Sequence, residues 1–150
     1  MQVGKTAQNA IAVMSYLAEC HRDKTGLVSS QTVADARILS KPLAAKILTT
    51  LSQAGYVKGA TGPGGGYSLA MKPESIRFID VVNCFEVKTQ IMQCPFGEGW
   101  CGNHDPCPMH YDILEMTQEM HAFLEKNHFG IFSESKNSSK RSESELPVQQ

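Results

Sequence analysis

The sequence predicts a mainly helical fold with a small β-hairpin wing, followed by a long C-terminal helix. Three observations predict it. Apolar residues recur at helical spacing in three segments before residue 55, and a glycine-rich stretch then separates two short segments of alternating side chains. Apolar residues recur again at spacings of three and four between residues 109 and 123. The 150 residues are enough for one domain with an appendage.

The first three segments carry the signals of amphipathic helices. In the first segment, the spacing of one buried helix face is followed by Ala10, Val13, Met14, Leu17 and Ala18. Ser29 and Ser30 are favourable N-caps for a short second helix through Ala36. Ser40 caps a third helix, and Gly55 is placed to end it. The apolar stripe of the third helix consists of Ala44, Ile47, Leu48 and Leu51.

A hairpin follows the third helix. Tyr56 and Val57 begin one short strand, Tyr67 and Leu69 alternate in another, and the GPGGG stretch between them accepts positive φ angles. These glycines do not predict a nucleotide site, because a phosphate-binding loop needs a following helix and a Gly-Lys-Ser/Thr motif. Three helices and a hairpin in this order predict a winged helix-turn-helix, a DNA-binding fold.

In this fold the third helix enters the major groove of DNA, and the wing lies along the backbone or the minor groove. The expected DNA contacts are Ser29, Ser30 and Gln31 on the second helix, Ser40, Lys41, Pro42, Leu43 and Lys46 on the third, and Thr61, Gly64, Gly65 and Gly66 in the wing. Ser30 and Ser40 have the alternative role of helix caps alone.

The charge distribution agrees with a DNA-binding first half. Residues 1–80 hold nine Lys and Arg against five Asp and Glu, whereas residues 81–150 hold five against ten. A basic half joined to an acidic half is typical of a nucleic-acid-binding domain linked to another function. Solvated charged faces also produce an imbalance of this size, so the charge supports the fold argument without replacing it.

Three cysteines are concentrated in the stretch CPFGEGWCGNHDPCPMH, residues 94–110. The spacing is Cys94-x6-Cys101-x5-Cys107-x2-His110, which lacks the C-x2-C knuckle of classical structural zinc sites. Wider spacings let a loop wrap a larger object, and thiolates suit zinc, copper(I) or an iron–sulfur cluster. The three cysteines and His110 are therefore candidate metal ligands, whereas His104 is expected to be an ordinary loop histidine.

The end of this stretch is predicted to begin a helix. Asp105 can cap a helix whose first residue is Pro106, a favoured position for proline. Cys107 and His110 would then lie three residues apart on one side of the first turn. The positive end of that helix would favour a ligating thiolate.

The long C-terminal helix carries the heptad seam Met109, Ile113, Met116, Met120 and Phe123. Leu114 and Leu124 widen the stripe. Packing on its own domain would also use this seam, but its length and narrowness favour pairing of two helices across the two-fold axis of a homodimer. The polar tail is predicted to be disordered. The expected organisation is a winged domain at 1–88, the cysteine loop and dimerisation helix at 89–132, and the tail at 133–150.

The bulk composition narrows the class of protein. No segment approaches the roughly 18 apolar residues of a membrane span, and the first residues lack the pattern of a signal peptide. The expected location is the cytoplasm, where thiols stay reduced, so the five cysteines favour metal binding or redox sensing over disulfides. Cys20 and Cys84 lie in apolar patterns and are expected to pack in the core. No catalytic constellation supports an enzyme.

From about Gly4 to Phe132 the chain resembles the iron–sulfur winged-helix regulators of the IscR, NsrR and RirA type. The resemblance rests on LSKPLAAKILTTLSQAGYVKGATGPGGGYSLA, on FIDVVNCFE, and on three spaced cysteines before a long helix. It implies a homodimer with a crossed pair of long helices. It also implies an iron–sulfur cluster held by Cys94, Cys101 and Cys107.

The resemblance bears on the fourth cluster ligand as well. In IscR-like members a histidine follows the third cysteine by three residues, and His110 matches it. In NsrR-like members an acidic residue near the N-terminus of the partner subunit takes this role, but the matching position here is Gln8, a poor ligand. This favours His110 and a 2Fe–2S cluster. The first cysteine gap is one residue longer than in the IscR pattern, which leaves 4Fe–4S open. Thr61 also stands where family wings usually carry arginine.

The resulting hypothesis is a cytoplasmic transcriptional regulator that binds a pseudo-palindromic operator in double-stranded DNA as a dimer. Loss of the cluster through iron shortage, oxidant or nitric oxide would shift the spacing of the two third helices and so change the affinity. One alternative keeps the DNA binding but places zinc or a thiol switch at the same cysteines. Another is a small iron–sulfur electron-transfer protein.

Overall fold

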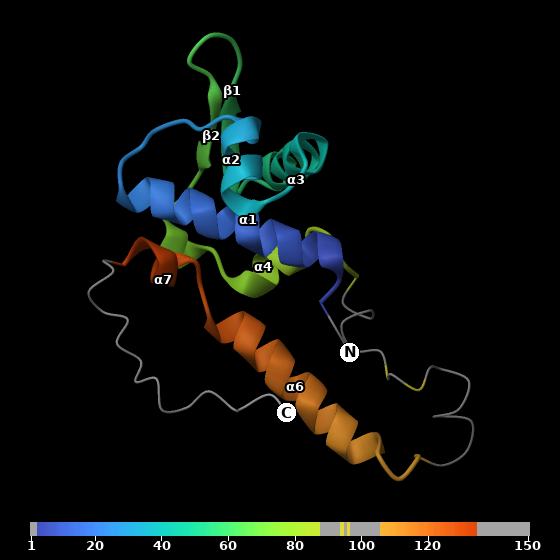
Figure 1. The fold of residues 1–150 in the computed structure, drawn as a ribbon. Coiled ribbons are helices and arrows are strands. Elements are labelled where there is room, and N and C mark those ends of the chain that lie inside the picture. Colours follow the sequence, from blue (N-terminus) through green and yellow to red (C-terminus); the bar gives the residue numbers. More distant parts are fainter. Residues whose placement is uncertain (1–2, 88–93, 95, 97–105, 135–150) are drawn as a thin grey trace.

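The computed structural model describes residues 3–87, 94, 96 and 106–134. Within them lie α1 (Lys5–Arg22), α2 (Ser30–Arg37), α3 (Lys41–Gln53), β1 (Val57–Ala60), β2 (Gly66–Leu69), the 3₁₀ turn η1 (Pro73–Ser75), α4 (Phe78–Val82), α6 (His110–Lys126) and α7 (Gly130–Ser133). Figure 1 shows α2, α3 and the hairpin on one side of α1. Helices α4 and α7 lie on the opposite side of α1, and α6 extends away from them.

The first three helices form where the apolar spacing predicts them. Every residue of the predicted stripe on α1 is buried, and so is every residue of the predicted stripe on α3. These two stripes meet in one core, to which the hairpin adds Val57 and Leu69. The helices are therefore held mainly by burial of their apolar faces, which contributes about 25 cal/mol per Å² of apolar surface removed from water.

Serine side chains begin α2 and α3 as the sequence predicts. Ser29 is the N-cap of α2, and its hydroxyl accepts a hydrogen bond from the Thr32 N–H at 3.1 Å. Ser40 caps α3 in the same way, accepting from the Leu43 N–H at 3.4 Å. Ser30 is the first helical residue of α2 rather than a cap. Gly55 follows α3 with φ of 87°, a left-handed conformation that ends the helix without steric cost.

The hairpin is joined to the segment before α2. Its strands pair antiparallel, with Val57 opposite Leu69 and Ala60 opposite Gly66. The Val28 N–H donates to the Tyr67 carbonyl at 3.0 Å, and the Tyr67 N–H donates back to the Val28 carbonyl at 2.7 Å. The wing and the start of α2 are therefore positioned together.

The chain after α6 returns to the winged domain. The Phe78 N–H donates to the Asn127 carbonyl at 3.0 Å, and the Phe129 N–H donates to the Ile76 carbonyl at 2.9 Å. The Phe78 ring contacts three aromatic rings, those of Phe123, Phe129 and Phe132. Because α7 packs against α1, the C-terminal end of α6 is fixed to the back of this domain.

One predicted helix start is wrong. α6 begins at His110, with Met109 as its N-cap, so Cys107 precedes the helix instead of lying in its first turn. The reason is Pro108, because a proline disfavours the helical region for the residue before it. Cys107 and His110 still lie close, since the His110 N–H donates to the Cys107 carbonyl at 3.0 Å. Asp105, the predicted cap, and the tail from residue 135 lie outside the described residues.

The turn between α2 and α3 contains a residue in an unfavourable conformation. Ile38 is the C-cap of α2 with φ of 55° and ψ of 48°, the left-handed region that β-branched side chains rarely adopt. Its side chain is 94% exposed, so burial does not offset this cost. The neighbours of Ile38 hold it there, because Arg37 is bonded to α1 and Leu39 packs against the core.

Replacing Ile38 by glycine is expected to raise the free energy of unfolding by about 1 kcal/mol, because glycine adopts this conformation without steric cost. Urea denaturation measures the change. Ile38→Ala is the matched control, because it removes the exposed side chain but keeps the Cβ atom, and its effect should stay within about 0.5 kcal/mol. A glycine variant no more stable than the alanine variant would contradict the assignment of strain.

Candidate DNA-binding surface and cysteine site

The first turns of α3 present the predicted groove-facing residues to solvent. Ser40, Lys41, Pro42 and Lys46 are exposed. Leu43 differs from them, because it is half-buried and packs against the core. The surface that this helix offers to a ligand is therefore polar and basic.

The start of α2 lies beside the wing. Ser29 and Gln31 are exposed, and Ser30 is half-buried. The Gln31 amide nitrogen donates to the Asp35 carboxylate at 2.7 Å, one turn further along the same helix. The N–H groups at this helix end carry partial positive charge, which suits a phosphate. Of these, the Thr32 N–H is bonded to the cap.

The wing glycines fall into two groups. Gly64 lies at the exposed tip of the wing with φ of 74°. Thr61, in the same loop, is also exposed. Gly65 and Gly66 are half-buried and lie against backbone: a Cβ atom at Gly65 would collide with the Ala60 carbonyl, and one at Gly66 would lie 2.5 Å from the Val28 carbonyl oxygen. These two glycines are required by close backbone approach within the wing joint.

A side chain that the sequence analysis missed holds α2 on α1. The Arg37 guanidinium donates to the Ala12 carbonyl at 3.0 Å, to the Ser15 hydroxyl at 3.0 Å and to the Glu19 carboxylate at 3.0 Å. It also lies 5.3 Å from the centre of the Tyr16 ring. Nothing in the local sequence signals this contact, because its partners lie 18 to 25 positions earlier.

Two of the four candidate metal ligands line one cavity. Cys94 and His110 border a space of about 80 Å³ together with Ile113, Leu114 and Thr117 of α6. The cavity thus combines a thiol and an imidazole with apolar walls. Cys107 is half-buried and lies next to His110 through the backbone bond described above. Cys101 lies outside the described residues, and among those described no three metal-binding side chains gather.

The two other cysteines behave as packing residues. Cys20 is buried in the core, as predicted. Cys84 is half-buried against the core, and its thiol donates to the Asp80 carbonyl at 3.3 Å. Burial raises the pKa of the Cys84 thiol, and the nearby Asp80 carboxylate raises it further. Because the thiolate is the ligating and reactive form, a raised pKa separates Cys84 from the candidate ligands.

Glu86 is a second residue that the sequence analysis missed. It lies just before the cysteine loop. Its carboxylate accepts a hydrogen bond from the N–H of Gly4, the residue that forms the N-cap of α1. Its other carboxylate oxygen is buried and has no hydrogen-bond partner among the described residues. A negative charge at a helix N-terminus is stabilising. The contact ties the start of the loop to the start of α1.

The predicted seam of α6 is divided between core and solvent. Met120 packs against the core and Ile113 is half-buried. Met116 is 52% exposed and Phe123 is 55% exposed, and Met109 is also exposed. The buried side of the helix is formed by Thr117 and Leu124. The described part of α6 therefore leaves much of an apolar stripe open to solvent.

A capped third helix and an adjoining wing, both exposed on one domain, define the winged helix-turn-helix class of DNA-binding proteins. Comparison with known families matches residues 3–130 to Rrf2, described as an iron-dependent transcriptional regulator. This match covers most of the chain, and the protein therefore belongs to the Rrf2 family. Since its relatives are transcriptional regulators, the predictions of a family resemblance and of a non-enzyme are both confirmed.

Two individual relatives are named as transcriptional regulators, and one solved structure has the same fold. The chain is 29% identical over 121 residues to a protein of Aquifex aeolicus named as a helix-turn-helix-type transcriptional regulator, covering 79% of this chain and 82% of that protein. It is 30% identical over 97 residues to the regulator IscR of Cereibacter sphaeroides, covering 65% of this chain and 63% of that protein. The structure of CymR, the global cysteine regulator of B. subtilis, superposes with a TM-score of 0.71 and 19% identity, covering 89% of this chain and 96% of that one.

The fold prediction is thus confirmed. Among the described helices, none has both the length and the apolar character that a membrane span requires.

Replacing Arg37 by methionine is expected to lower the free energy of unfolding by about 2–3 kcal/mol, because the Ala12 carbonyl and the Ser15 hydroxyl lose a charged donor. Thermal or urea denaturation measures this change. The control is Arg77→Met, which removes an exposed ion pair with Asp80 on the same helix turn and should cost less than about 1 kcal/mol. Equal losses in the two variants would contradict the role given to Arg37.

Proposed function

We propose that the protein is a dimeric transcriptional regulator that binds a pseudo-palindromic operator and senses iron, redox state or nitric oxide through an iron–sulfur cluster. The observation that carries the proposal is that Cys94 and His110, from opposite ends of the cysteine-rich stretch, line one cavity at the start of α6. Membership of a family described as iron-dependent supports it, as does similarity to a protein named IscR.

The residues present fit such a cluster. Thiolates and imidazole are the ligands that iron–sulfur clusters use, and Cys94, Cys101, Cys107 and His110 supply them. Ile113 and Leu114 provide an apolar wall on the side of α6, and exclusion of solvent is one of the levers by which proteins tune such sites. The histidine favours a 2Fe–2S cluster, with 4Fe–4S as the other possibility. When bound, the cluster supplies reversible electron transfer and reactivity toward oxidants and nitric oxide.

The DNA-binding side of the proposal uses the exposed residues of α3, α2 and the wing. Lys41 and Lys46 would neutralise phosphates, Ser40 and Pro42 would approach base edges, and the N-terminus of α2 would take a phosphate. Gly64 and Thr61 at the wing tip would follow the backbone or the minor groove. Thr61 carries no charge, so the wing would contribute less electrostatic affinity than an arginine would.

The first test is an absorbance spectrum with iron and sulfide analysis on protein purified without oxygen. Visible absorbance is expected, together with a change of roughly 5- to 100-fold in operator affinity on cluster removal, the usual range of coupling free energies. The operator for this test is selected from a random-sequence duplex library. The variant Cys94→Ala/Cys101→Ala/Cys107→Ala should lose the colour and the response to iron or oxidant.

Cys84→Ala is the matched control and should keep the cluster, because that thiol packs against the core outside the cysteine loop. If the triple variant responds to iron and oxidant as the wild type does, the sensing proposal fails. If the protein stays colourless after reconstitution but binds DNA, the zinc site or thiol switch replaces the cluster. That second candidate is supported by the likeness in fold to CymR of Staphylococcus aureus, whose structure is that of an oxidized form. The family does not support the electron-transfer alternative.

The dimer is proposed from the solvent-exposed stripe of α6. Exposed apolar side chains at heptad spacing are typical of helices that pair. Met109, Ile113, Met116, Met120 and Phe123 would form the interface. In such a dimer the two DNA-binding surfaces would be related by a two-fold axis, matching the symmetry of the operator.

Replacing Met116 by aspartate is expected to dissociate the dimer, because a carboxylate would be buried without a partner in the paired stripe. Light scattering after size-exclusion chromatography should give the 16.4 kDa monomer in place of about twice that mass. Gln118→Asp introduces the same charge on another part of α6 and should leave the dimer intact. A Met116→Asp protein of dimer mass would exclude this interface.

A further inference from the structure

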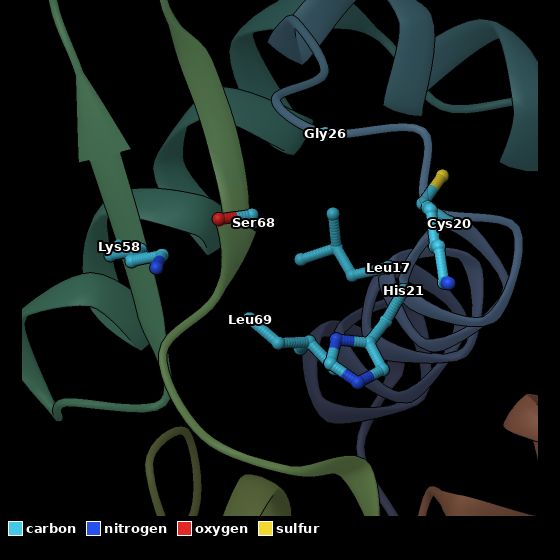
Figure 2. A pocket seen from close by; sticks show the side chains of 8 residues that line it. Leu17, Cys20, His21, Gly26, Lys58, Ser68 and Leu69 are labelled. Atoms are coloured by element: carbon cyan, nitrogen blue, oxygen red, sulfur yellow. The ribbon is translucent and has the colours of Figure 1, made fainter.

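A pocket lies between the wing and the C-terminal end of α1. It is distinct from the candidate DNA-binding surface and from the cysteine site. Its volume is about 340 Å³, within the range of small-molecule sites. Figure 2 shows its construction: the two strands form one wall, the last turns of α1 form the other, and the loop that contains Gly26 passes above.

The pocket has an apolar floor. Leu17, Leu69 and Cys20 line it and are almost completely buried. The Leu17 side chain projects into the middle of the space between the walls in Figure 2. A ligand with an apolar portion would therefore bury that portion here.

The polar lining of the pocket carries charge of one sign. Lys24 and Lys58 are exposed at its edge, and His21 adds a third cation when it is protonated. Ser68, directly opposite Lys58 in the strand pair, adds a hydroxyl. None of the lining residues is acidic. Such a lining favours an anion and disfavours an ammonium group.

The acidic groups near the pocket are engaged elsewhere. Asp23 accepts two hydrogen bonds from Arg22 at 2.7 and 3.0 Å. Glu74, which interacts electrostatically with His21, accepts a hydrogen bond from Ser133 at 3.3 Å. The last carbonyls of α1 are also satisfied, since the Thr25 N–H donates to the Cys20 carbonyl at 3.0 Å and the Lys24 N–H to that of His21 at 3.3 Å. Within the described part of the chain, no ion pair neutralises Lys24 or Lys58, whereas Glu74 faces His21.

Lys24 is held in the left-handed region, with φ of 54°. Glycine or asparagine is the usual residue in that conformation. Here the conformation closes the end of α1, since it allows the two N–H groups of Lys24 and Thr25 to bond the last carbonyls of the helix. It fixes the backbone of Lys24 at the edge of the pocket.

We propose that this pocket binds a small organic anion, one with a carboxylate or phosphate head and an apolar portion. The head would lie among Lys24, Lys58 and Ser68, and the apolar portion on Leu17 and Leu69. Free amino acids fit poorly, because their ammonium group would meet the lysines. The loop above the pocket continues through Val28, which is bonded to the wing, to the N-cap of α2. A bound anion would therefore touch both sides of the joint between wing and α2 and alter operator affinity.

The test uses the full, isotope-labelled chain and four probes in nuclear magnetic resonance titrations: hexanoate, hexyl phosphate, hexylammonium and inorganic phosphate. Hexanoate, hexyl phosphate or both should shift the amide signals of Gly26, Ser68 and Leu69 in a saturable way, which also tells the carboxylate and phosphate heads apart. In Lys24→Met/Lys58→Met the binding should weaken about tenfold. Lys5→Met/Lys72→Met removes the same charge from exposed positions outside the pocket and should bind as the wild type does.

Four results would overturn the proposal: no saturable shift with either hexyl anion, equal affinity in Lys24→Met/Lys58→Met and the wild type, an equal loss in the two double variants, or hexylammonium binding as tightly as the anions. Inorganic phosphate binding as tightly as hexyl phosphate would refute the role of the apolar floor. The titration needs neither DNA nor a cluster, so its outcome is separate from that of the proposed function.

Discussion

The helix-turn-helix depends on the attachment of Arg37 to α1. A single guanidinium bonds two side chains and one backbone carbonyl of α1, at the residue where α2 ends. The next residue, Ile38, must then reverse the chain in a conformation that its side chain disfavours. Leu39 returns to the core, and Ser40 starts α3. The angle between α2 and α3 thus depends on this charged contact and on the turn at Ile38, in addition to the direct packing of the two helices.

Much of this fold could be predicted because its signals are local. The apolar stripes of α1 and α3, the caps Ser29 and Ser40, and the glycines of the wing each act within a few residues. Arg37 and Glu86 could not be found in this way, since their partners lie 18 to 82 positions away. The strain at Ile38 also had no signal, because an apolar residue after a helix is ordinary until its backbone angles are known.

The cysteine site was predicted from spacing, and spacing is only part of its geometry. The proximity of Cys94 to His110 across the loop agrees with a shared site. The predicted helix start at Pro106 is wrong because Pro108 disfavours the helical region for Cys107, since a proline constrains the residue before it as well as itself. Cys107 consequently lies before the helix, and its carbonyl accepts a hydrogen bond from the His110 N–H.

On the proposed function, two connections carry a change at the cysteine loop to the DNA-binding surface. Glu86, at one end of the loop, caps α1. At the other end of the loop, α6 is joined to α7 by the aromatic contacts of the Phe78 ring and by the backbone bond between Phe129 and Ile76, and α7 packs on α1. Both connections end on α1, the helix to which Arg37 is hydrogen-bonded. Along both connections a rearrangement of the loop would act on α1 first, and because packed helices move as units rather than deform continuously, a small displacement there would reorient α2, α3 and the wing together.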